Sequence, residues 1–173
     1  MHVETNGTMR ALAGGAVGAS VVTALHESVR RLRPDAPRMD VLGMRAISAV
    51  MRSGGMKPPA ADRLHTITMI GDLLGNGLYY SLVGTKGDDR VWLRGAVLGL
   101  AAGIGGVVLP PLMGLGSRPS GRTTQTMIMT VAWYLAGGFA AAATARMLAR
   151  AQERSAVERT GEAAPKGWRL EDM

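Results

Sequence analysis

The sequence predicts an all-α, polytopic membrane protein, built as a bundle of four transmembrane helices with a short interfacial helix in one loop. The main evidence is two long segments without an ionisable side chain, residues 95–116 and 123–145. A helix of about 20 apolar residues is long enough to cross a ~30 Å hydrocarbon layer. The chain of 173 residues also holds 24 glycines and no cysteine, and Gly-rich spans are typical of helices that pack in lipid.

Four spans are expected in order, at about residues 9–29, 64–84, 92–115 and 124–146. The first two are weaker, because they contain polar side chains as well as apolar ones. Pro110 and Pro111 should break or kink the third span near its end, since proline cannot donate a helical hydrogen bond. Residues 1–148 then form the transmembrane domain, and residues 149–173 form a polar C-terminal tail.

The loop between the first two spans is basic, with eight Lys or Arg between residues 30 and 63 against three Asp. The positive-inside rule places this loop in the cytoplasm and both termini outside. The tail is basic as well, so the numbers of Lys and Arg on the two sides are equal. The topology is therefore assigned from the first helix, which usually sets the orientation.

Within that loop, residues 40–52 have the period of an amphipathic helix, with methionine and isoleucine on one face and arginine on the other. Asp40 is expected to be the N-cap, and Gly54 and Gly55 should end the helix. We interpret it as an interfacial helix on anionic headgroups. A gating or docking helix is the alternative.

Small residues four positions apart lie on one face of a helix and allow two backbones to approach closely. Every predicted span carries such a strip. The expected helix-packing glycines are Gly14, Gly18, Gly71, Gly75, Gly95, Gly99, Gly103 and Gly137.

The second span carries a polar stripe with Asp72 at its centre. Asp72 lies about eight residues into the span, roughly 12 Å deep at ~1.5 Å per residue. A carboxylate there costs ~2.5–3.5 kcal/mol, so it should face the bundle interior. The predicted polar intramembrane seam comprises Glu27, His65, Asp72, Asn76, Tyr79, Thr130 and Tyr134.

Three interpretations of this seam stay open. It can be a hydrogen-bonded contact between helices. It can be a proton or ion path, with His65 and Glu27 at its mouth and Asp72 as the relay. A metal or catalytic site built from His26, Glu27 and His65 is the weakest interpretation, because no ligand-pair spacing supports it. No catalytic residue or cofactor motif is recognised, and the basic residues are not interleaved with aromatics as in nucleic-acid binding.

Two stretches resemble the YagU-like family of small bacterial inner-membrane proteins. One is Glu27 followed by the segment Pro37-Arg38-Met39-Asp40, and the other is Trp92, which opens a Gly-rich span that ends in the segment 111–115, PLMGL. The resemblance implies a four-helix fold, a location in the bacterial inner membrane and a link to acid tolerance.

The expected function is that of a non-enzymatic structural or assembly protein whose helices pack through glycine strips. Its expected partners are the lipid bilayer and either a second copy or a larger membrane complex, with no cofactor and no nucleic acid. The alternatives are a proton-coupled carrier or acid-stress factor that uses Asp72, and a membrane-embedded metalloenzyme.

Overall fold

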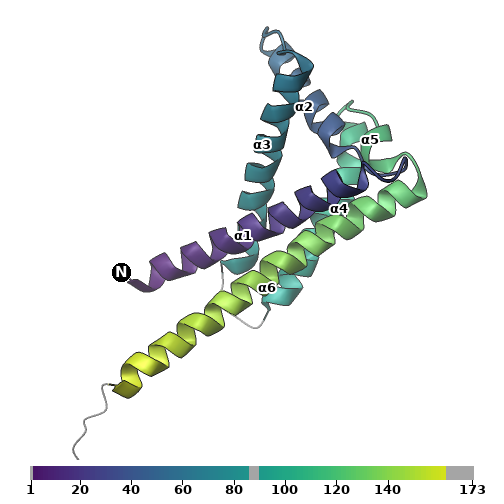
Figure 1. Cartoon of the computed structure of the whole chain (residues 1–173). Helices are drawn as coiled ribbons and strands as arrows, with labels where there is room; N and C mark the ends of the chain where they lie inside the picture. Colours follow the sequence, from purple (N-terminus) through teal and green to yellow (C-terminus); the bar gives the residue numbers. More distant parts are fainter. Residues whose placement is uncertain (1, 86–89, 163–173) are drawn as a thin grey trace, which may run out of the picture.

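The computed structural model describes residues 2–85 and 90–162, and over these residues the chain is helical and contains no strand (Figure 1). The prediction of an all-α fold is therefore confirmed. In chain order the elements are α1 (His2–Val29), α2 (Met39–Ser53), α3 (Ala61–Ser81), the 3-10 turn η1 (Leu82–Gly84), α4 (Val91–Leu112), α5 (Arg118–Gly121) and α6 (Thr124–Glu162).

The main body of the molecule consists of α1, α4 and α6, with α6 packed against both of the others (Figure 1). These three helices are long and apolar enough to cross a membrane, over Gly7–Val29, Val91–Leu112 and Thr124–Glu158. Helix α6 continues without interruption past the boundary predicted at residues 148 and 149 and reaches Glu162. The remainder of the predicted tail, residues 163–173, lies outside the described part of the chain.

Helix α3 covers the second predicted span but departs from the other three. It rises away from the α1, α4 and α6 bundle at a steep angle, and α2 returns from its far end toward α5 (Figure 1). Within the described residues, α3 is not among the helices apolar enough to cross a membrane. Its charged and polar side chains, such as Asp62, Arg63 and Asn76, account for this.

The loop helix predicted over residues 40–52 is present as α2, and it ends at Gly54 as expected. Gly55 follows with φ of 75°, a left-handed conformation that favours glycine. The prediction that Asp40 is the N-cap is wrong, because Arg38 occupies that position. Asp40 lies in the first turn, where its carboxylate accepts hydrogen bonds of 3.1 and 3.0 Å from the Arg38 guanidinium.

Burial raises the pKa of Asp40, but the hydrogen bonds from Arg38 and from the Val41 backbone outweigh it and hold that pKa below its ordinary value. The α2 N-terminus thus carries a stabilised carboxylate where the helix dipole favours negative charge.

In α4 the two prolines lie in the last turn, and the helix ends at Leu112, one residue beyond Pro111. The break expected from this proline pair is thus the end of the helix itself. A proline removes a hydrogen bond inside a helix, so two in succession are tolerated best where the helix is about to end.

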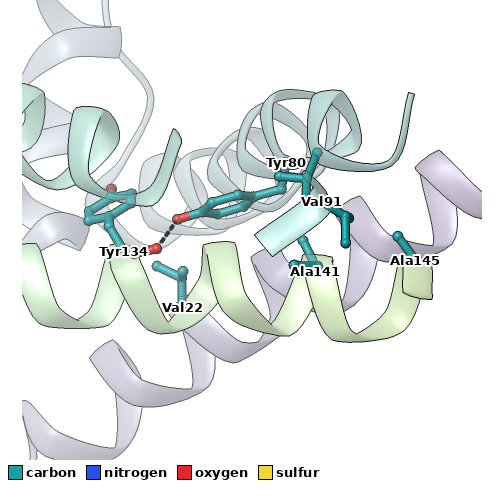
Figure 2. Close-up of a cluster of buried hydrophobic side chains, with 8 residues drawn as sticks. Val22, Tyr80, Val91, Tyr134, Ala141 and Ala145 are labelled. Carbon is teal, nitrogen blue, oxygen red and sulfur yellow. Dashed lines mark hydrogen bonds between the residues drawn. The ribbon is translucent and has the colours of Figure 1, made fainter. Parts of the chain in front are cut away.

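Figure 2 shows the core, in which α6 alanines meet one side chain from each neighbouring helix. Tyr80, from α3, is fully buried, and its hydroxyl donates a hydrogen bond of 2.6 Å to the Tyr134 carbonyl of α6. The buried cluster consists of Val22, Tyr80, Val83, Val91, Tyr134, Ala141, Ala142 and Ala145. The C-terminal end of α3 is therefore anchored in the main bundle.

Candidate functional site

The glycine strip of α4 packs directly on the backbone of α6. A Cβ added to Gly99 would lie 2.8 Å from the Leu135 Cα, and one added to Gly103 would lie 2.7 Å from the Val131 Cα. A Cβ added to Gly95 would lie closer still, 2.5 Å from the Gly138 carbonyl oxygen. Real Cβ atoms do not approach backbone atoms this closely, so a larger residue at any of these three positions would separate α4 from α6.

The strip of α1 packs on a second face of α6, about 100° around the helix from the face that meets α4. A Cβ on Gly14 would lie 2.9 Å from the Ala141 carbonyl oxygen, and one on Gly18 would lie 2.8 Å from that of Gly137. Gly137 in turn meets Val22 and the Gly18 carbonyl. The chain therefore uses small residues on two adjoining faces of α6.

Gly71 and Gly75, on α3, behave differently. A Cβ at either position would meet no described atom of another helix within 4 Å, so the prediction that they pack against another helix of the same chain is wrong. The contact between α3 and α1 uses another glycine instead: Gly15 lies against the Gly77 carbonyl and the backbone of Ser81. The prediction considered only the glycine pair of α1 and therefore missed Gly15, although Ala11 and Ala19 lie four residues to either side of it.

The open glycines lie among exposed apolar side chains. On α3, Ile67, Ile70, Leu74 and Leu78 are exposed at positions that share this face of the helix. We call the set of Ile67, Ile70, Gly71, Leu74, Gly75 and Leu78 the open α3 face.

Most hydroxyl groups of the predicted seam bind backbone carbonyls of neighbouring elements. Thr130 is fully buried and donates to the Ser120 carbonyl of α5 at 3.0 Å. Tyr79 donates to the Leu98 carbonyl of α4 at 2.9 Å. These bonds join helices, which is the behaviour expected of a structural contact.

Asp72 is half-buried on α3, and its carboxylate accepts a hydrogen bond of 3.0 Å from the Asn76 amide, one helical turn away. The Tyr134 side chain of α6 lies beside Asn76. Three residues of the predicted seam are thus brought together between α3 and α6.

At the predicted mouth of the seam, Glu27 is held by the Arg30 guanidinium through two hydrogen bonds of 2.7 and 2.6 Å. His65 lies half-buried near the start of α3 and forms no three-residue ligand group with His26 and Glu27. Over residues 2–85 and 90–162, no three His, Asp or Glu side chains are close enough together to hold a metal ion. The geometry therefore offers no ligand set to the weak metal candidates.

His26 has a role that the sequence did not reveal. It is buried, and its ring makes edge-to-face contacts with Trp133 and Tyr134, at centroid distances of 4.9 and 5.7 Å. Its Nδ1 lies 2.9 Å from the Val22 carbonyl, which can only accept, so Nδ1 carries the hydrogen. Trp133 is the signal that could have suggested an aromatic partner for His26 at this level of the bundle.

No family model, no curated protein and no solved structure matches this chain. The resemblance to the YagU-like family therefore stays a prediction from the sequence.

Proposed function

We propose that this chain is a non-enzymatic, multi-pass protein of the bacterial inner membrane that assembles with a second copy of itself through the open α3 face. The observation that carries this proposal is the contrast among its glycine strips. Gly14, Gly18, Gly95, Gly99 and Gly103 meet another helix closely, whereas Gly71 and Gly75 meet nothing within 4 Å in the described chain.

The chemistry of the open α3 face supports a helix as the partner. Small residues let a partner helix approach the α3 backbone closely, and such a contact would also bury the exposed apolar side chains around them. The flanking side chains Ile70, Leu74 and Leu78 are 56%, 62% and 65% exposed, which leaves an apolar rim around the two glycines.

The test is self-association of the full chain in phosphatidylglycerol and phosphatidylcholine vesicles, followed by Förster transfer between labelled copies at decreasing protein-to-lipid ratio. We expect Gly71→Ile/Gly75→Ile to weaken association at least about tenfold, because each new side chain separates the backbones. The matched control is Ala101→Ile, which enlarges an exposed position on α4 and should leave association within about twofold of the unaltered protein. A protein that stays monomeric, or a double variant that associates normally, would contradict the proposal.

A proton-coupled carrier is the second candidate, supported by the cluster of Asp72, Asn76 and Tyr134. We place it second because Glu27, at the proposed mouth, is already paired with Arg30. Proton flux into pH-dye-loaded liposomes separates the two: the assembly proposal expects Asp72→Asn to leave flux and folding unchanged. A large loss of flux in Asp72→Asn would favour the carrier and overturn the assembly role.

A further inference from the structure

A groove of about 630 Å³ opens between α2, the start of α3 and the loop of residues 113–117. It lies at the end of the molecule where α1 and α4 end and α6 begins (Figure 1). If α1, α4 and α6 cross a membrane as we propose, this end is where the chain leaves the hydrocarbon layer, at the level of the lipid headgroups.

One face of α2 forms most of the groove wall. Its lining residues follow each other at steps of three and one, which places them on a single helical face: Val41, Met44, Arg45, Ser48, Ala49 and Arg52. Leu64 of α3 and Leu115 of the loop complete the apolar part. Ser48 is only 7% exposed, so its hydroxyl is the polar group at the base.

The groove carries two positive charges and no acidic side chain lines it. Arg45 donates one hydrogen bond of 2.8 Å to the Leu115 carbonyl, which fixes the guanidinium at the edge. A guanidinium has five N–H donors, so the others stay available to a ligand. Arg52 pairs with no carboxylate within the described ranges, and its exposed guanidinium lies two turns further along the same face.

We propose that this groove binds the phosphate headgroup of an anionic phospholipid. Arg45 and Arg52 would hold the phosphate, because a planar guanidinium matches phosphate oxygens in charge and in geometry. The apolar wall of Val41, Met44 and Leu64 suits a ligand that also has a hydrocarbon portion.

The surroundings favour a lipid over a free phosphate ester as the source of this group. Leu112, at the end of α4, and Met113, the first residue of the loop that borders the groove, are 77% and 68% exposed. Apolar side chains at this level can contact acyl chains, whereas a small soluble phosphate would gain nothing from them. Basic clusters next to membrane spans are likewise the usual sites of anionic lipid binding.

The experiment uses the full chain in nanodiscs of phosphatidylcholine, with phosphatidylglycerol added in increasing amounts and retained lipid counted by native mass spectrometry. We expect at least one phosphatidylglycerol to be retained in preference to phosphatidylcholine. Arg45→Gln/Arg52→Gln should weaken that binding at least about tenfold, since it removes two charge-assisted contacts. The matched control, Arg33→Gln/Arg118→Gln, removes two exposed charges that do not line the groove and should change binding less than about twofold.

Arg45 also bonds the Leu115 carbonyl, so a second variant guards against a folding defect. Ala49→Glu places a negative charge in the groove at an exposed position and should also weaken binding at least about tenfold. Equal retention of the two lipids, or an equal loss in the control pair, would overturn the proposal. Full competition by glycerol 3-phosphate would instead identify a soluble phosphate ester and overturn the lipid assignment. A protein that fails to self-associate but passes this test would reject only the role of the open α3 face.

Discussion

Helices α4 and α3 carry glycines at the same four-residue spacing, yet the two sets lie in opposite surroundings. Gly99 and Gly103 leave no room for a side chain against α6, while Gly71 and Gly75 face open space in the described molecule. The spacing thus identifies a face that permits close approach without specifying the neighbour. The neighbour is decided by the rest of the helix: α4 is apolar throughout its middle, whereas α3 carries Asp72 and Asn76 beside its glycines.

The strongest test of this difference adds one methyl group at a glycine of each helix. Gly99→Ala should lower the free energy of unfolding by about 1–3 kcal/mol, because the new Cβ meets backbone atoms of Leu135 and Tyr134 that cannot rotate away. Gly71→Ala should raise it by up to ~1 kcal/mol, since alanine favours a helix more than glycine does. The measurement is unfolding in mixed micelles, followed by far-ultraviolet circular dichroism at a dilution where the protein is monomeric. If both variants changed the free energy of unfolding in the same direction, the two strips would have the same surroundings.

A second test asks how firmly the C-terminal end of α3 belongs to the packed region. Tyr80→Phe should lower the free energy of unfolding by about 1–2 kcal/mol, because it leaves the buried Tyr134 carbonyl without its hydrogen bond from α3. Tyr79→Phe is the matched change one residue earlier. It removes a bond to the Leu98 carbonyl at a half-buried position and should cost less. If the two variants are equally stable, Tyr80 is not the anchor we describe.

The smallest effect concerns α2, which packs on the N-terminal part of α3 through the contact of Gly43 with Thr68. Asp40 has a lowered pKa in the folded protein, so its pairing with Arg38 stabilises the fold above the ordinary carboxyl pKa. That contribution is lost as the pH falls through the lower pKa of the folded state. Because Arg38 is half-exposed, we expect the Asp40–Arg38 pair to contribute less than about 1 kcal/mol to the free energy of unfolding.

Asp40→Asn should therefore lower the free energy of unfolding at pH 7, and the two proteins should converge once the pH falls below the lowered pKa of Asp40. Unfolding curves of both proteins across this pH range provide the measurement. A difference that persists undiminished at low pH would assign the effect to packing and not to charge.

Local patterns predicted much of the fold. The extent of α2 followed from its amphipathic period and from Gly54 and Gly55, and the packed strips of α1 and α4 followed from the four-residue spacing. These features depend on residues close together in the sequence, where helical geometry fixes which side chains share a face.

The features that were missed depend on partners far apart in the sequence. Tyr80 finds the carbonyl of Tyr134, and Arg122 pairs with Asp35 at 2.8 Å. Helical periodicity contains no information about either contact. The departure of α3 from the bundle has the same origin. It depends on Gly15, which packs against the backbone near the C-terminal end of α3, and on α2, which packs on the N-terminal part of α3.

The length of α6 has a consequence for whatever meets its far end. A helix of 39 residues extends about 58 Å at ~1.5 Å per residue, roughly twice the ~30 Å thickness of a hydrocarbon layer. Its later turns, which display Arg150, Glu153, Arg154 and Glu158 together, would therefore stand in water as a rigid spacer. A soluble partner that bound these turns would be held at a fixed distance above the lipid headgroups.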